Sequence, residues 1–174
     1  MSCFGWLSSL EARGAKIIVA GPPCSGKNSF AELHRLAGDE ILDYDVVHAE
    51  LTGLPLYVHD DDQISRTIHV FGERAMAMRQ GWIIQTAADP AARARAREAH
   101  TARSIVLRVW PGECHARLEA SDRPDLAKMR LRPVIDEWWR RYRADHEAQT
   151  TMCLGQPLEI SLTYFALNDQ VPAQ

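Results

Sequence analysis

The sequence lacks several features that mark membrane, secreted and bulk nucleic-acid-binding proteins. It has no apolar run near the ~18 residues that a transmembrane helix needs. Its four cysteines, Cys3, Cys24, Cys114 and Cys153, are scattered and form no Cys-x-x-Cys pair, which argues against a zinc site or a disulfide framework. A formal net charge of −3 offers no general basic surface for DNA. We therefore expect a cytoplasmic protein that does not span a membrane.

The chain also lacks repeats and low-complexity segments, and its 174 residues suit one domain. We assign residues 1–14 to an N-terminal extension and residues 15–174 to this domain. Residues 3–12 carry apolar side chains at helical spacing and predict a short amphipathic helix. Packing of that helix on the domain is the first interpretation, and contact with a partner or a membrane is the alternative.

The most specific motif is a Gly-x-x-x-x-Gly-Lys sequence, Gly21 to Lys27, at the end of an apolar run. Its glycines permit a backbone path in which successive N–H groups point at phosphate oxygens, and the following helix presents its positive N-terminus. The Lys27 ammonium then reaches the β- and γ-phosphates. A glycine-rich turn without a ligand is the alternative. The residues expected to bind the nucleotide are Gly21, Pro22, Pro23, Cys24, Ser25, Gly26, Lys27, Asn28 and Ser29.

Two positions depart from the usual form of such a site. Asn28 stands where a Ser or Thr hydroxyl ordinarily binds Mg²⁺. Thr86 stands at the end of the third expected strand, where an acidic residue would help to hold the metal. Because an amide carbonyl and a hydroxyl are both oxygen donors, Asn28 and Thr86 are the candidate Mg²⁺ contacts, and weak or slow catalysis is physically reasonable with them.

Strands and helices alternate along the chain and predict an α/β fold, a three-layer sandwich with a five-stranded, mainly parallel sheet. In such a sheet the ligand lies beyond the carboxyl ends of the strands, where the loops 21–27, 43–45, 86–89 and 110–113 would converge. The expected strands are 16–20, 40–42, 82–86, 104–109 and 158–167, and the expected helices are 29–37, 46–51, 62–80, 89–100 and 133–147, with a short helix through 114–118 and a polar loop at 121–128.

Two aspartates follow the second expected strand. Asp45 is the preferred general base, which would accept the proton of an attacking hydroxyl, and Asp43 is the alternative base. Capping of the next helix is the other interpretation for both. For His48 two interpretations remain, a contact to the acceptor and a structural role. The acidic run 59–62 opens the clearest helix, which favours capping over metal coordination.

Four arginines are candidates for phosphate contacts. Arg117 and Arg123 flank a short loop and are candidate lid residues that would stabilise charge on the transferring phosphate. A solvated loop is the alternative for these two. Arg93 and Arg97 share a helix face and can serve acceptor phosphates, although a solvated helix is the favoured interpretation.

Three segments together, 21–27 (Gly-Pro-Pro-Cys-Ser-Gly-Lys), 41–47 (Ile-Leu-Asp-Tyr-Asp-Val-Val) and Arg117 to Pro124, resemble the small P-loop kinases of the polynucleotide-kinase-like group. Many members of that group are encoded by bacteriophages and labelled AAA-family ATPases. The resemblance covers about residues 15–147. It implies the strand order 2-3-1-4-5, a base at Asp45 or Asp43, and a lid around residues 117–128 that carries Arg117 and Arg123.

The expected function is therefore transfer of the γ-phosphoryl group of ATP, with Mg²⁺, to a hydroxyl of a nucleoside, a nucleotide or a polynucleotide end. The expected partners are ATP and this acceptor, and not a membrane. One alternative is an AAA-type ATPase, which needs an acidic pair at the third strand and a sheet with another strand between the first and the third. The second is a nucleotide-binding regulatory module with little turnover, which Asn28 favours.

Overall fold

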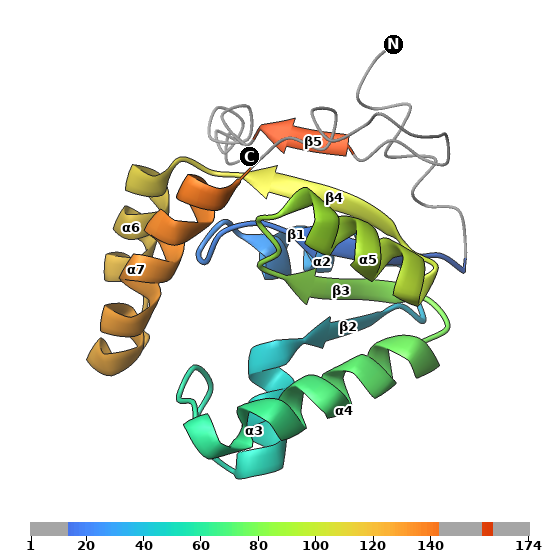
Figure 1. The fold of residues 1–174 in the computed structure, drawn as a ribbon, viewed down its shortest axis with the longest axis horizontal. Helices are drawn as coiled ribbons and strands as arrows, with labels where there is room; N and C mark the ends of the chain where they lie inside the picture. Colours follow the sequence, from blue (N-terminus) through green and yellow to red (C-terminus); the bar gives the residue numbers. More distant parts are fainter. Residues whose placement is uncertain (1–13, 143–157, 162–174) are drawn as a thin grey trace, which may run out of the picture.

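A parallel β-sheet forms the centre of the computed structural model, which describes residues 14–142 and 158–161 (Figure 1). The strands lie in the order β2-β3-β1-β4-β5, and every neighbouring pair is parallel. The order 2-3-1-4 of the first four strands is the predicted one. Residues 162–167 of the last predicted strand lie outside the described residues. The strands are β1 (Lys16–Ala20), β2 (Glu40–Asp43), β3 (Gly81–Gln85), β4 (Arg103–Arg108) and β5 (Leu158–Ser161).

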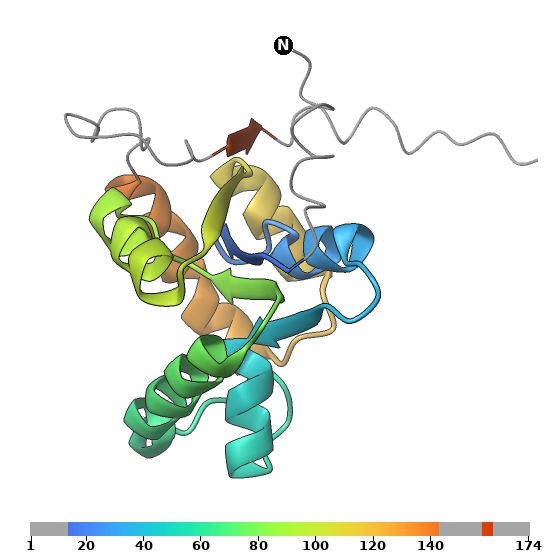
Figure 2. The same ribbon diagram turned by 90° about the vertical axis from the view of Figure 1, so that its right-hand side faces the viewer.

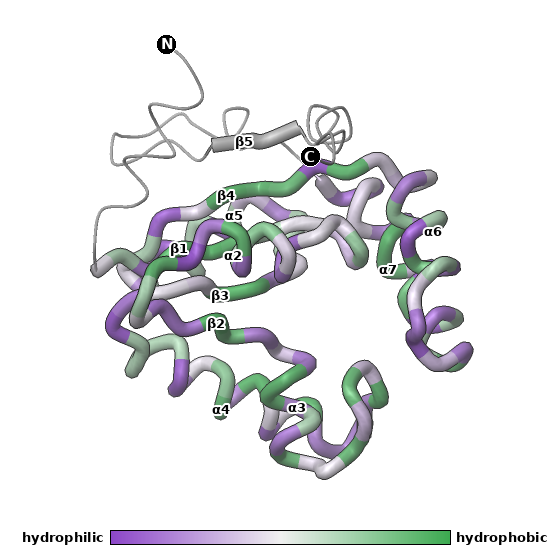
Figure 3. Tube along the Cα trace, turned by 180° about the vertical axis from the view of Figure 1, so that it is seen from behind, coloured by the Kyte–Doolittle hydropathy of each residue, from purple (hydrophilic) through white to green (hydrophobic). Residues whose placement is uncertain are grey.

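The central strands form because they are short β-branched runs that are covered on both faces. Ile18 of β1 lies opposite Ile83 of β3, and both side chains are fully buried. Ile105 of β4 is fully buried as well, and the middle of β4 is coloured as hydrophobic in Figure 3. The buried centre of the sheet confines polar residues to the ends of these strands and the loops that follow them.

Helices cover both faces of the sheet, as the side view in Figure 2 shows. Phe30 of α2 packs on one face against Trp82, and Ala75 of α4 packs on the other face near Ile83. Trp138 of α7 covers the second face next to Val106. The helices are α2 (Lys27–His34), α3 (Tyr44–Thr52), α4 (Ile64–Ala77), α5 (Pro90–His100), α6 (Pro111–Ala120) and α7 (Asp125–Arg141), with a short 3-10 helix η1 (Asp61–Gln63) before α4.

The last long helix begins earlier than predicted. Helix α7 starts at Asp125 and contains Pro133 in its interior, so the expected polar loop is reduced to residues 121–124. The acidic first turn at Asp125 is the start signal that the prediction missed in favour of the proline. The helix ends at Arg141, and residues 143–147 lie outside the described residues. The expected lid region, 117–128, therefore consists of two helix ends and a short connection.

Two apolar side chains of the helices face solvent. Leu33 of α2 is 71% exposed and Ile68 of α4 is 58% exposed. The buried stripe of α4 includes Thr67 and Ala75, because the Thr67 hydroxyl finds a partner in the backbone of Gln63. Ile68 follows Thr67 directly and therefore turns to solvent.

No helix in the described ranges 14–142 and 158–161 is long and apolar enough to cross a membrane. The amphipathic helix predicted over residues 3–12 lies outside these ranges.

Candidate functional site

The loop from Gly21 to Gly26 joins β1 to α2 at the carboxyl end of the sheet. A Cβ on Gly21 would lie 2.7 Å from Leu107 O and 2.8 Å from Ser25 Oγ, so this position has no room for a side chain. Gly26 caps α2 with φ of 85°, and Cys24 also has a positive φ of 61°. Such a path, with a close approach and left-handed residues, is the one predicted for a phosphate-binding loop.

Two polar groups inside this loop have the character of ligand contacts. Lys27 Nζ donates hydrogen bonds to Gly21 O (3.0 Å) and Pro22 O (2.7 Å), and burial lowers the Lys27 pKa to about 8. Ser25 Oγ is fully buried and has no hydrogen-bond partner within the described part of the chain. A buried hydroxyl without a partner is costly, and a phosphate oxygen would satisfy it. The loop therefore fits the phosphates of a nucleotide.

Asp43, at the end of β2, caps helix α3. Its Oδ1 accepts a hydrogen bond from Asp45 N (2.8 Å), and its Oδ2 accepts one from Asn28 Nδ2 (2.5 Å). Burial raises the pKa of the Asp43 carboxyl, and the Asn28 hydrogen bond opposes that shift. The carboxylates of Asp43 and Asp45 both act electrostatically on Lys27. The structure thus brings the two predicted acidic candidates to the phosphate loop, and it assigns the capping role to Asp43.

The two candidate metal contacts, Asn28 and Thr86, differ in their hydrogen bonds and exposure. Asn28 uses its amide nitrogen on Asp43, which leaves its Oδ1 as an oxygen donor of the kind that Mg²⁺ prefers. Thr86 is exposed just beyond β3 and makes no hydrogen bond to Asn28 or Asp43 in the described residues. No group of three or more His, Cys, Asp and Glu residues with metal-holding geometry occurs in the described residues either. A Mg²⁺ ion here would therefore take much of its coordination from nucleotide phosphates and water.

The two predicted lid arginines lie next to the phosphate loop. Arg117 Nη1 is 3.8 Å from the position that a Cβ on Gly26 would take, and Arg117 Nε donates a 2.7 Å hydrogen bond to Glu113 Oε1. The charges of Arg117, Arg123 and Lys27 all act on the Cys24 thiol, whose pKa is nevertheless raised by burial. Positive charge is therefore concentrated around the loop, as binding of a polyphosphate requires.

Two contacts join the arm formed by α6 and α7 to residues 53–63, the segment that follows α3. The Arg123 guanidinium lies 4.1 Å from the centre of the Tyr57 ring, within range of a cation–π interaction. Arg130 Nη1 lies 3.5 Å from Asp61 Oδ1. Tyr57 itself has a positive φ of 69°. Tyr57 was not predicted as a site residue, and nothing in its local sequence indicates the contact.

Arg93 does not have either of its predicted roles. Its side chain is fully buried, and Nη1 donates to Ala87 O (3.1 Å) and Ala88 O (2.6 Å). Its guanidinium also lies 5.4 Å from the centre of the Tyr142 ring. Arg93 is therefore neither solvated nor open to a ligand, and it holds the 87–88 backbone instead. Arg97 donates a 3.2 Å hydrogen bond to Ser104 Oγ.

Two histidines lie near Asp45, and one of them contacts its carboxylate. His59 Nε2 lies 2.7 Å from Asp45 Oδ1. His48 is fully buried and bonded to Thr67, which is the structural alternative predicted for it. Asp60 Oδ1 accepts a hydrogen bond from Asp62 N (3.0 Å), so the acidic run caps the short helix η1 that precedes α4, whereas α4 itself begins after Gln63 without a side-chain cap. The sequence analysis placed His59 in that run only, because no local pattern links it to Asp45.

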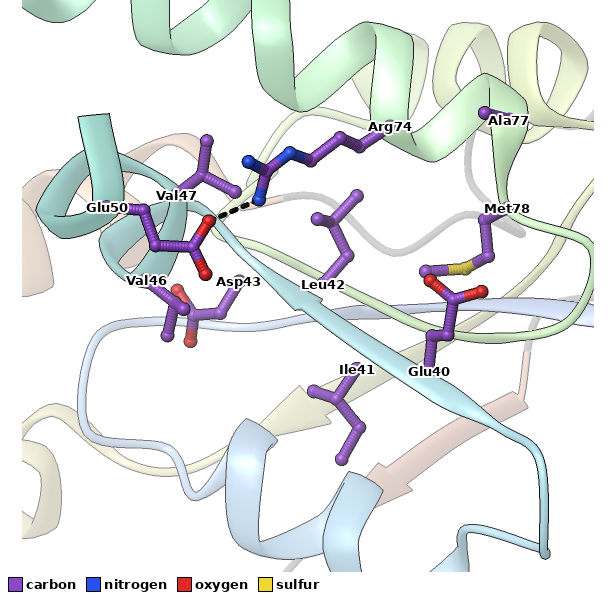
Figure 4. Close-up of a pocket in the computed structure, with 10 residues that line it drawn as sticks. All are labelled: Glu40, Ile41, Leu42, Asp43, Val46, Val47, Glu50, Arg74, Ala77 and Met78. Atoms are coloured by element: carbon purple, nitrogen blue, oxygen red, sulfur yellow. Dashed lines mark hydrogen bonds and ion pairs between the residues drawn. The ribbon is translucent and has the colours of Figure 1, made fainter.

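A separate cavity of about 330 Å³ follows the outer edge of β2 (Figure 4). Leu42 points toward α4, and the Glu50–Arg74 ion pair, with Nη1 and Oε2 2.5 Å apart, bridges α3 and α4 beside it. Residues 21–29 do not line this cavity, which meets the site described above only at Asp43. Its lining comprises Glu40, Ile41, Leu42, Asp43, Val46, Val47, Glu50, Arg74, Ala77 and Met78.

No family model matches the chain, and no curated protein matches it in sequence. Among solved structures, the protein APE1195 is similar with a TM-score of 0.51 and 16% identity, over 87% of this chain and 86% of that one. A gluconokinase from Sinorhizobium meliloti 1021 has a TM-score of 0.49 and 18% identity, over 84% of this chain and 82% of that one. A shikimate kinase from Acinetobacter baumannii in complex with shikimate has a TM-score of 0.49 and 16% identity, over 95% and 99%. The likeness to APE1195 shows the fold alone, an α/β fold with a parallel sheet.

Proposed function

We propose that the protein is an ATP-dependent phosphotransferase that moves the γ-phosphoryl group to a hydroxyl of a nucleoside, a nucleotide or a polynucleotide end. One observation carries this proposal. The Gly21–Gly26 loop holds the Lys27 ammonium and a buried Ser25 hydroxyl that has no partner in the described residues, and the carboxylates at and after the end of β2 act directly on that ammonium.

Nucleotide binding is supported by the loop and by the start of α2. The backbone N–H groups of the loop and the positive end of the helix favour phosphate oxygens. Lys27 would exchange its bonds to Gly21 O and Pro22 O for bonds to phosphate, which are stronger because the phosphate oxygens carry the opposite charge. Bound Mg²⁺ would neutralise charge on the phosphates, and Asn28 Oδ1 and Asp43 are the oxygens that would hold it.

Transfer is supported by Asp45 and the arginines. Asp45 is half-buried and its backbone, not its carboxylate, serves the α3 cap, so the carboxylate can accept the proton of an acceptor hydroxyl. Arg117 and Arg123 lie close enough to the loop to stabilise charge on the transferring phosphate. The acceptor class follows from the motif resemblance of residues 21–27, 41–47 and 117–124.

The pairing of β1 with β3 favours this proposal over an AAA-type ATPase. Ile18 and Ile83 are direct partners, with no strand between theirs, as in the kinase group. Strand β3 ends at Gln85 and is followed by Thr86, so the acidic pair that an AAA-type site needs does not follow it.

A phosphate-transfer screen tests the proposal. Purified protein is incubated with γ-labelled ATP and Mg²⁺, with nucleosides, nucleotides and 5′-hydroxyl DNA and RNA as acceptors, and with gluconate and shikimate as comparison acceptors. We expect labelled product with an acceptor of the first group, lost in Asp45→Asn and retained in the exposed control Asp62→Asn. ATP binding without transfer or hydrolysis would contradict the proposal and would indicate a nucleotide-binding regulatory module. Hydrolysis without any acceptor would replace it with an ATPase.

A further inference from the structure

The Asp45 carboxylate is held by one side chain from a distant part of the sequence. His59 Nε2 lies 2.7 Å from Asp45 Oδ1, and the two side chains are each 31% exposed. A carboxylate only accepts, so the Nε2–H of His59 is the donor. Asp45 Oδ2 accepts no hydrogen bond from any residue in the described ranges. His59 therefore fixes one oxygen of Asp45 and leaves the other open.

His59 is itself placed by the buried His48. The backbone N–H of Asp60, the residue after His59, donates a 2.9 Å hydrogen bond to His48 Nε2. That ring nitrogen therefore carries no proton, and His48 Nδ1–H is the donor to Thr67 Oγ1 at 2.9 Å. Thr67 Oγ1 in turn donates to Gln63 O at 2.9 Å. The chain of bonds anchors the end of the 53–60 segment to α3 and α4.

Ring packing restrains His59 further. Its ring lies edge-on to Tyr44, with centroids 5.8 Å apart at 79°, and to His48, with centroids 4.9 Å apart at 60°. Tyr44 is stacked on His48 at 6.1 Å. Since Tyr44 and His48 belong to α3, as does Asp45, the same helix carries the carboxylate and the rings that hold its partner.

We propose that His59 is a positioning residue that orients Asp45 so that its Oδ2 faces the acceptor hydroxyl. This inference rests on the proposed phosphotransferase function. In the step, Asp45 Oδ2 takes the hydroxyl proton while the acceptor oxygen bonds to the γ-phosphorus. The bond from that phosphorus to the bridging oxygen breaks, and its electron pair stays on ADP. His59 keeps its own proton throughout and acts only through Asp45.

Three variants test this role by steady-state kinetics. In His59→Ala we expect kcat to fall about 10- to 100-fold with the KM for ATP unchanged, because a misplaced catalytic group costs rate while the phosphate loop is intact. In His59→Gln, whose side-chain amide can donate to Asp45, we expect most of the rate to return. The control His69→Ala removes an exposed histidine of α4 and should leave both constants unchanged. An unchanged kcat in His59→Ala, or a rise in the KM for ATP that accounts for the whole loss, would overturn the inference.

Nitrogen-15 NMR of histidine-labelled wild-type protein gives a readout that does not need turnover. We expect a proton on His59 Nε2, and a ring with Nδ1 alone protonated would overturn the inference. The two proposals fail separately. A wild-type enzyme that transfers phosphate and is indifferent to His59→Ala refutes only the positioning role, whereas a wild-type protein that binds ATP and transfers nothing refutes the function and the positioning role with it.

Discussion

Asn28 Nδ2 donates a 2.5 Å hydrogen bond to Asp43 Oδ2, and this bond ties the first turn of α2 to the end of β2. Asp43 is buried, and its other oxygen caps α3. Asn28, which departs from the usual phosphate-loop pattern, thus makes a structural hydrogen bond to Asp43. A Ser or Thr side chain at position 28 would be too short to make the same bond. We infer that Asn28 has two roles. It holds the start of α2, which carries Lys27, against Asp43 at the end of β2, and its Oδ1 is a candidate Mg²⁺ contact.

Replacement of Asn28 separates these two roles. Asn28→Ala and Asn28→Ser both leave Asp43 Oδ2 without its partner, so we expect each to lower the free energy of unfolding by about 1 to 3 kcal/mol. Urea unfolding measures this loss, with Leu33→Ala on the exposed side of α2 as the control. Only Asn28→Ser keeps an oxygen for Mg²⁺, so it should transfer phosphate faster than Asn28→Ala. Equal rates in the two variants would contradict a role of residue 28 in metal binding.

The affinity for ATP is expected to fall with rising pH. Burial lowers the Lys27 pKa to about 8, and phosphate binds only the charged ammonium. Raising the pH through this value discharges Lys27 before ATP binds, so the dissociation constant should increase by up to about 10-fold for each pH unit above it. Isothermal titration between about pH 7.5 and about pH 9.5 measures the slope. Lys27→Arg stays charged across this range and should lose the slope. A wild-type affinity that is constant over the same range contradicts the account.

Gly21 is expected to tolerate no side chain. In Gly21→Ala the new Cβ would lie 2.7 Å from Leu107 O, so the loop must move away from β4. We expect weaker ATP binding and a loss of about 1 to 3 kcal/mol in the free energy of unfolding. Gly72→Ala is the matched control, because a Cβ on Gly72 meets nothing within 4 Å and the residue lies inside α4. In Gly72→Ala the free energy of unfolding should increase by about 0.5 to 1 kcal/mol. Equal stability of the two variants contradicts the close approach at Gly21.

Arg93 is expected to matter for stability and not for ligand binding. Arg93→Ala removes the donors that hold Ala87 O and Ala88 O in a fully buried place, so we expect a loss of about 3 kcal/mol in thermal or urea unfolding. Arg95→Ala, on the exposed side of α5, should change stability by less than about 0.5 kcal/mol. A folded Arg93→Ala protein with wild-type stability but impaired acceptor binding would restore the ligand role that the structure argues against.

Local sequence patterns correctly predicted those strands and helix starts that depend on neighbouring residues alone. The apolar run 16–20 forms β1 with those bounds, and Asp89 and Pro90 open α5 where the capping signal indicated. The start of α7 was misplaced because an interior Pro133 looks like a helix start. In α4, Ala75 is buried as its spacing indicated, but Ile68 is exposed and Thr67 is buried, because the Thr67 hydroxyl finds its partner only in the folded helix.

The candidate site also contains one part that could be predicted from the sequence and another part that could not. The phosphate loop could be predicted because one continuous segment, 21–27, supplies its chemistry. The contacts of His59 with Asp45 and of Arg123 with Tyr57 join segments that are far apart in the sequence, and no spacing rule encodes them. Burial of Arg93 was equally hidden, since an alanine-rich helix with regular arginines has the pattern of a solvated one.

Calorimetric titration of the wild-type protein and of Lys27→Ala with Mg²⁺ and ATP measures whether the loop from Gly21 to Lys27 binds a nucleotide. The account predicts saturable binding by the wild type and an affinity lower by at least about 10-fold in Lys27→Ala, because a charge-assisted bond to phosphate is lost. A folded wild-type protein that binds neither ATP nor GTP, or a Lys27→Ala variant that binds ATP as tightly as the wild type, would contradict it.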